Sequence, residues 1–248
     1  MAFAVRAITL DLDDTLWPFA PIGARIERVL DDWMRRHSPA TADMFPIEAM
    51  RALRERVAAE HPALGHDMSA LRRLTLETAL RESGGDVALA DAAYDAFFAE
   101  RNRVECYPDA LDALARISAR LPVAALSNGN ADLVRIGLDH HFRVQLSACT
   151  FGVAKPDPAI FHAACERLGV PPAEVLHVGD CPHADVAGAA RAGLRSCWIN
   201  RAGADGRRAD WPHATLQPDL HFDSLAALAD WLDADPTAPA PRTWSPHA

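Results

Sequence analysis

The stretch that decides the fold is Asp11-Leu12-Asp13-Asp14-Thr15, which follows the run Val5-Arg6-Ala7-Ile8-Thr9-Leu10. The run is rich in β-branched and other apolar residues, a composition typical of a buried strand. Because side chains alternate along a strand, Asp11 and Asp13 point the same way while Leu12 turns toward the core. Two crowded carboxylates are costly unless a cation, a proton or hydrogen bonds compensate. The stretch therefore indicates either a nucleophilic acid beside a general acid/base, or an Asp-rich turn or helix cap without chemistry.

The composition is that of an ordinary soluble globular protein. The chain has 248 residues, of which 50% are hydrophobic and 24% charged, and its net charge is -9. This acidic balance argues against a general nucleic-acid binder or a binder of anionic membranes. Five cysteines without a CxxC pair predict neither a disulfide framework nor a zinc site, which fits a reducing cytoplasm. No signal peptide and no apolar run of membrane-spanning length is evident, so we expect a cytoplasmic monomer or homodimer with no ion-pumping role.

Helical patterns alone fill residues 18–104, whereas strands and helices alternate from residue 105 onward. Strands alternating with helices favour a parallel sheet with right-handed crossovers. We therefore predict an α/β fold, a doubly wound Rossmann-like parallel sheet core with an inserted α-helical cap. The expected division is residues 1–17 and 105–232 for the core, 18–104 for the cap, and a Pro-rich disordered tail over 233–248. The expected elements are strands over 121–126, 145–149, 175–178, 195–199 and 220–222, and cap helices near 22–33, 47–60, 68–82 and 87–98.

Two polar clusters follow later segments of the predicted core. Ser127 and Asn128 follow a strand, where a small hydroxyl and backbone N–H groups can approach an anion, although Asn-Gly also favours a plain turn. Lys155 is the only lysine among 25 basic residues, and Pro156 and Pro158 restrict the backbone around it. A lysine ammonium suits a phosphoryl oxygen, while a solvated loop lysine is the commoner alternative.

The last cluster is Gly179-Asp180, followed by Asp185 in the first turn of a predicted helix. Asp180 at a strand tip indicates a metal carboxylate, with Asp185 ligating or supporting the metal. An acid at a helix start is also favoured by the helix dipole alone. Taken together, the clusters lie at the carboxyl ends of four strands, which is the edge where open α/β sheets bind ligands.

The set DLDDT, SNGN, KPDP and GDxxxxD resembles the four motifs of the haloacid dehalogenase-like (HAD) hydrolase superfamily, over residues 8–199. The helical block lies where that superfamily carries its helical, first-type caps (subfamily I). The resemblance implies that Asp11 attacks phosphorus to form an aspartyl-phosphate, while Asp13 protonates the leaving oxygen and then activates water. It further implies these roles: phosphate binding by Ser127, Asn128 and Lys155; Mg²⁺ binding by Asp11, the Asp13 carbonyl and Asp180; and support of the site by Asp185.

Several branches of the superfamily stay open. Its 2-haloacid dehalogenases attack carbon and need neither Mg²⁺ nor the second acid, so the presence of Asp13 and Asp180 favours phosphate chemistry. A phosphatase is the commoner reading, with a sugar phosphatase and a phosphomutase as alternatives. A non-enzymatic binding protein on the same scaffold is the least favoured, since every expected catalytic position is filled.

A closer resemblance is to bacterial phosphatases that act on FMN and on 5-amino-6-(5-phospho-D-ribitylamino)uracil. It is carried by residues 66–68, 127–130, 176–180 and 192–199. This implies a small phosphorylated metabolite, such as FMN or a ribityl phosphate, with the cap closing over its ring. The candidates for contacting it are Trp17, by stacking, and His66, Arg72 and Arg73. The alternatives are a Trp17 that wedges core against cap and arginines that face water.

Overall fold

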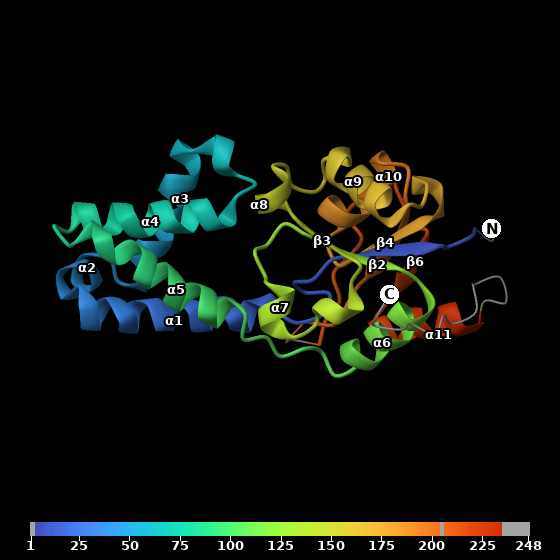
Figure 1. The fold of residues 1–248 in the computed structure, drawn as a ribbon, viewed down its shortest axis with the longest axis horizontal. Helices are drawn as coiled ribbons and strands as arrows, with labels where there is room; N and C mark the ends of the chain where they lie inside the picture. Colours follow the sequence, from blue (N-terminus) through green and yellow to red (C-terminus); the bar gives the residue numbers. More distant parts are fainter. Residues whose placement is uncertain (1–2, 204–205, 235–248) are drawn as a thin grey trace, which may run out of the picture. The chain divides into compact units, whose positions relative to one another are not determined.

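A computed structural model of the chain describes residues 3–203 and 206–234 (Figure 1). It divides into two compact units. The core unit comprises Met1–Pro18, Glu105–Asn128 and Gly137–Ala248, and the helical unit comprises Phe19–Val104 and Gly129–Ile136. Residues 129–136, which we expected in the core, thus group with the helical unit.

The core unit contains a six-stranded parallel sheet in the order β3-β2-β1-β4-β5-β6. The chain runs from β1 to β2 and β3 on one side and then returns to β4 on the other. Strand order therefore reverses beside β1, which is where such sheets bind ligands. The predicted α/β fold is confirmed. The strands are β1 (Ala7–Leu10), β2 (Val123–Ser127), β3 (Val144–Ser147), β4 (Val175–Gly179), β5 (Arg195–Ile199) and β6 (Leu220–Phe222).

Helices cover both faces of this sheet, α9 and α10 on one face and α6 and α11 on the other (Figure 1). This burial explains why β1, β2 and β4 are mostly apolar, since every residue of the three is buried. Helix α9 packs its apolar stripe into the core beside the sheet and ends at Gly169, whose φ of 68° suits glycine. The core helices are α6 (Ala110–Arg120), α8 (Ala148–Phe151), α9 (Pro158–Leu168), α10 (Gly188–Arg191) and α11 (Leu225–Ala234).

The helical unit is built around α1, which buries Ile22, Ile26, Leu30 and Met34 at helical spacing. Helix α1 packs on α5, and α3 packs on α4. A short α2 occupies part of the segment that we expected to be a loop, with a proline in its first turn. The helices are α1 (Phe19–His37), α2 (Pro39–Met44), α3 (Ile47–Glu60), α4 (Met68–Glu82), α5 (Ala90–Arg101) and α7 (Leu133–Ile136).

Further segments differ from the sequence-based expectation. The helix that we expected around Asp185 is instead a π-helical segment, η5 (Pro182–Ala187), followed by α10. Such π-helical turns often occur at functional sites. The tail expected from residue 233 begins inside α11, and its remainder, 235–248, lies outside the described residues. None of the described helices has both the length and the apolar composition required to cross a membrane.

Candidate active site

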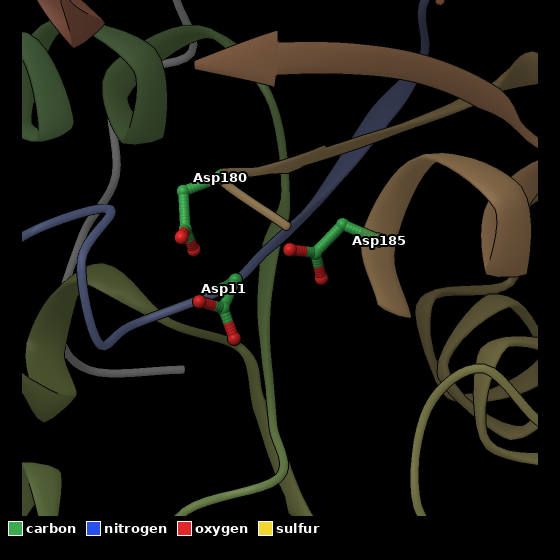
Figure 2. Close-up of side chains that lie close together, drawn as sticks. All are labelled: Asp11, Asp180 and Asp185. Carbon is green, nitrogen blue, oxygen red and sulfur yellow. The ribbon is translucent and has the colours of Figure 1, made fainter. Parts of the chain in front are cut away.

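Three carboxylates from separate segments of the core unit converge (Figure 2). Asp11 directly follows β1, Asp180 directly follows β4, and Asp185 lies in η5. One oxygen from each lies within 4.8 Å of the others. The backbone N–H of Asp11 donates to the Val178 carbonyl at 2.9 Å, which holds the two strand ends together. Carboxylate oxygens grouped in this way fit a hard divalent cation such as Mg²⁺.

Lys155 enters the same cluster and is buried. Its Nζ donates to Asp11 Oδ1 at 2.5 Å and to Asp185 Oδ1 at 2.7 Å. Burial alone would lower the pKa of Lys155, but the charges of the two carboxylates outweigh it and raise that pKa above its usual range. An ammonium has three N–H donors, and these two bonds use two of them.

The acids differ in how readily they ionise. Burial raises the pKa of Asp11 to about 7, against the attraction of Lys155 and with the repulsion of Asp185. Burial, followed by the charge of Asp11, raises the pKa of Asp180 to about 8. Burial also acts to raise the pKa of Asp185, but the ammonium of Lys155 outweighs it and holds that pKa well below the usual range. Lys155 thus compensates Asp185 more completely than Asp180, and a bound cation would favour the ionised form of Asp180.

Asp185 is held by three donors. Its Oδ1 accepts from Lys155 and bonds His177 Nε2 at 2.9 Å, and its Oδ2 accepts from the backbone N–H of Cys181 at 2.9 Å. Gly179 leaves the space for it, since a Cβ at position 179 would lie 2.3 Å from the Asp185 carboxyl carbon. Asp185 thus holds the Lys155 ammonium, and its oxygens also lie close enough to the cluster to ligate a metal.

His177 and Thr9, which we did not predict as site residues, extend this network beneath the site. His177 Nδ1 bonds Thr9 Oγ1 at 2.8 Å across the β1–β4 pair. Burial lowers the pKa of His177, so its imidazole is neutral and links the strands without adding a charge. The available signal was a polar residue in each of two buried, otherwise apolar strands.

Ser127 is the last residue of β2, and Asn128 directly follows it. Ser127 is buried and lies in register with Ser147 of β3. The Asn128 side chain accepts from the Lys155 backbone N–H at 2.8 Å and donates to the Lys155 carbonyl at 2.9 Å. Its amide is therefore engaged with the loop that carries Lys155, which favours a positioning role over the phosphate contact that we predicted.

Trp17, which we predicted to stack on a substrate ring, is buried. Its exposed fraction is 0%, and its indole Nε1 donates to Asp13 Oδ1 at 2.8 Å. A buried indole N–H requires an acceptor, and the Asp13 carboxylate supplies one. Trp17 thus contacts the predicted general acid rather than offering an open ring face.

His66, Arg72 and Arg73 belong to the helical unit. Arg73 lies 3.7 Å from the Tyr94 ring centroid and pairs with Asp91. Arg72 lies over the Phe97 ring, and burial lowers its pKa to about 10. Both guanidinium groups therefore lie against aromatic rings. A substrate contact by any of the three stays a prediction.

The fold and site are those of a hydrolase that places its acids at the carboxyl ends of a parallel sheet. Residues 5–193 match the haloacid dehalogenase-like hydrolase family. The chain belongs to this family, as the four sequence motifs implied.

Known relatives fall into two chemical groups. The chain is 33% identical to the Escherichia coli 5-amino-6-(5-phospho-D-ribitylamino)uracil phosphatase YigB, covering 92% of this chain and 96% of the relative. It is 34% identical to a Thermus thermophilus phosphoserine phosphatase, covering 89% and 96%. Among solved structures, a 2-haloacid dehalogenase from Pseudomonas syringae pv. Tomato matches with a TM-score of 0.83 and 36% identity, covering 92% of this chain and 98% of that one. The chain is therefore similar in sequence to phosphatases, and in both fold and sequence to a dehalogenase.

Proposed function

We propose that the protein is a Mg²⁺-dependent phosphomonoester hydrolase that works through an aspartyl-phosphate on Asp11. The observation that carries the proposal is the pair Asp11 and Asp180. Their oxygens lie within 4.8 Å of one another, and burial raises the pKa of both, helped by the charge of Asp185 at Asp11 and by the charges of Asp11 and Asp185 at Asp180, so a divalent cation would relieve the pair. A carboxylate can attack a carbon–halogen bond without a bound metal ion. In phosphoryl transfer, by contrast, a cation neutralises the charge on the phosphoryl oxygens.

The residues of the chain divide the reaction between them. An oxygen of Asp11 attacks phosphorus, the ester P–O bond breaks, and Asp13 gives a proton to the leaving oxygen. Asp13 then takes a proton from the water that attacks the aspartyl-phosphate, which releases phosphate and restores the Asp11 carboxylate. The Lys155 ammonium and the Ser127 hydroxyl would hold the phosphoryl oxygens during both steps.

Asp11, Asp180 and the Asp13 backbone carbonyl would hold Mg²⁺, with Asp185 in support. When bound, the ion would neutralise charge on the phosphoryl oxygens. Asp185 would hold the Lys155 ammonium for this role through the 2.7 Å bond.

For the substrate, we propose a small phosphorylated metabolite with a ribityl chain, such as FMN or the ribitylamino-uracil phosphate of the riboflavin pathway. The similarity to the E. coli phosphatase named for that uracil compound supports it. The helical unit would act as a cap over the substrate ring, with His66, Arg72 and Arg73 as candidates for contacts. We further propose that the protein acts in the cytoplasm as a monomer or homodimer.

A 2-haloacid dehalogenase is the second candidate, because the Pseudomonas syringae structure is 36% identical over nearly its whole length. The presence of Asp13, held by Trp17 at 2.8 Å, weighs against it. Dehalogenation by a carboxylate nucleophile requires no acid to protonate the halide that leaves.

The test measures phosphate release from FMN, the ribitylamino-uracil phosphate, phosphoserine and sugar phosphates, and halide release from 2-chloropropionate, with and without Mg²⁺. Mg²⁺-dependent phosphate release, lost in Asp11→Asn, is expected. Halide release without Mg²⁺ would transfer the assignment to the dehalogenase. Conversion of a sugar phosphate to its isomer without phosphate release would indicate a phosphomutase.

A further inference from the structure

The loop from Asp13 to Trp17 closes on itself directly after β1. The backbone N–H of Asp14, a residue with φ of 60°, donates to the Trp17 carbonyl at 2.7 Å. Asp13 and Trp17 also form an isolated parallel bridge. The indole of Trp17 then donates back to the Asp13 side chain. Both the backbone and the side chain of Trp17 therefore hold the turn that presents the Asp13 carboxyl group.

Two further bonds attach this loop to the rest of the core unit. The Leu16 carbonyl accepts from the backbone N–H of Tyr107 at 2.9 Å, and the Thr15 carbonyl accepts from Arg201 Nε at 3.2 Å. Arg201 is itself held by two bonds to Asp109. Because the backbone of the loop is anchored apart from the indole, removing the indole N–H should change the Asp13 side chain more than the loop.

The chemistry of the indole distinguishes the two oxygens of Asp13. An indole N–H donates and cannot accept, so the Asp13 oxygen that it contacts must supply a lone pair. That oxygen is Oδ1, at 2.8 Å from Nε1. A protonated carboxyl group keeps its better acceptor on the carbonyl oxygen, so an Oδ1 held by the indole favours the proton on Oδ2.

From this geometry we propose that Trp17 is a positioning residue for acid–base catalysis: its indole N–H fixes Asp13 Oδ1 and directs the exchanged proton to Oδ2. The inference rests on the proposed function. In the first step the O–H bond at Oδ2 breaks, and its proton joins the alcohol oxygen as the P–O bond electrons leave with that oxygen. In the second step Oδ2 takes the proton of the attacking water. Trp17 touches neither the substrate nor the reacting atoms.

The test compares Trp17→Phe with the wild type on phosphate monoesters that range from p-nitrophenyl phosphate to an alkyl phosphate. Its readout is kcat/KM, which reports the step up to release of the alcohol. A nitrophenolate leaves without a proton, whereas an alkoxide requires one. We expect Trp17→Phe to lower kcat/KM by roughly 10–100-fold for the alkyl ester and by less than about 3-fold for the nitrophenyl ester. An equal loss for both esters, or no loss for either, would overturn the inference.

A matched control is Trp211→Phe, which also removes an indole bond, from Nε1 to the Leu216 carbonyl. Any loss of kcat/KM that this variant shows relative to the wild type should be the same for the alkyl and the nitrophenyl ester. Should Trp17→Phe fail to fold, Trp17 is replaced by 3-benzothienylalanine, which keeps the shape of the ring and lacks the N–H. The same dependence on the leaving group is expected, and its absence would overturn the proposal.

Failure of the proposed function is separable from failure of this inference. A wild type that hydrolyses none of the esters contradicts the phosphatase assignment and, with it, the positioning role of Trp17. If the wild type hydrolyses the esters and Trp17→Phe lowers kcat/KM by the same factor for all of them, only the positioning role is contradicted. The indole ¹H–¹⁵N resonance of Trp17 tests the bond itself and should shift in Asp13→Ala, because the acceptor is removed.

Discussion

The side-chain amide of Asn128 makes two hydrogen bonds to the backbone of Lys155, accepting from its N–H at 2.8 Å and donating to its carbonyl at 2.9 Å. The residue that follows β2 therefore holds the backbone of the Lys155 loop through its side chain. These bonds fix the backbone of Lys155, whose side chain extends into the buried cluster of acids. Asn128 therefore acts on the site through the position of Lys155.

We predict that Asn128→Ala lowers kcat/KM by about 10–100-fold, because a displaced Lys155 no longer aligns with the phosphoryl oxygens. It should also reduce the free energy of unfolding by about 1–3 kcal/mol, since two backbone groups lose their partners. Urea unfolding and phosphate release measure the two effects. Asn200 is the matched control, because its amide makes the same pair of bonds to the backbone of Ala209. If Asn200→Ala lowers activity as much, the loss reflects stability rather than the position of Lys155.

A second prediction concerns the buried ion cluster. Lys155→Met should lower the free energy of unfolding by about 3–5 kcal/mol, because it leaves Asp11 and Asp185 without their cation. The double variant Lys155→Met/Asp185→Asn should lose less free energy of unfolding than Lys155→Met alone, because the amide of Asn carries no charge that needs a partner. Urea unfolding of the two variants and of Asp185→Asn completes the cycle. Additive losses would mean that Lys155 and Asp185 are not coupled.

A third prediction follows from the raised pKa of Asp180. Because burial and the charge of Asp11 raise it to about 8, the folded protein binds a proton there more tightly than the unfolded chain. Without metal, the stability contributed by this group is full below about pH 4 and is lost as the pH rises to about 8. Asp180→Asn should therefore be more stable than the wild type at pH 8.5 in the presence of EDTA. Thermal unfolding across this range measures the difference, and parallel curves would contradict it.

Mg²⁺ should reverse that difference. At a concentration 100 times its Kd, the ion should stabilise the wild type by about 2.7 kcal/mol, because it binds only the folded state. Asp180→Asn should lose this gain. Glu166→Gln serves as the control, since Glu166 is an exposed acid on α9. Equal stabilisation of all three proteins by Mg²⁺ would place the ion elsewhere.

The last prediction tests an ion pair away from the acid cluster. Asp109 accepts two bonds from Arg201 and two from the backbone N–H groups of Leu225 and Ala226 at the start of α11. Burial opposes its ionisation, but the bonds from Arg201 outweigh it and lower the pKa of Asp109. Its contribution to stability is therefore present above the unfolded pKa, near 3.9, and is lost as the pH falls through the lower folded pKa.

Asp109→Asn should accordingly lower the free energy of unfolding by about 1–3 kcal/mol at pH 7, with the gap narrowing below about pH 4. Urea unfolding at both pH values measures it. Asp223→Asn removes an exposed pair with Arg208 and should change stability little. A gap for Asp109→Asn that is constant with pH would mean that the charge of Asp109 contributes nothing.

Local pattern was sufficient to predict much of the fold. Strand β5, strand β6 and helices α3 and α4 have the bounds expected from the sequence, because each combines a clear apolar pattern with turn residues at its ends. Helix α2 was missed because prolines at its two sides resemble loop punctuation, although a proline is well tolerated in a first helical turn. The π-helical segment was missed because its sequence is compatible with an ordinary helix.

The acids and Lys155 could be predicted as one cluster because parallel strands end at one edge. The partners that hold them could not. Trp17 is separated from Asp13 by four positions, and only the closed turn decides that its indole meets the carboxylate. The bond from Asn128 to Lys155 depends likewise on two loops brought together by the sheet. Hydrogen bonds of this kind leave no periodic signal in a sequence.

Lys155 is the only lysine among the chain's 25 basic residues, and it lies in the acid cluster. Supplying ¹⁵N-lysine during expression would therefore label a single position, at the catalytic centre itself. One backbone resonance and one ammonium resonance would then report binding of ion, substrate or inhibitor, without the crowding that usually requires assignment of a whole spectrum. The unusual preference of this chain for arginine thus leaves a spectroscopic probe already in place.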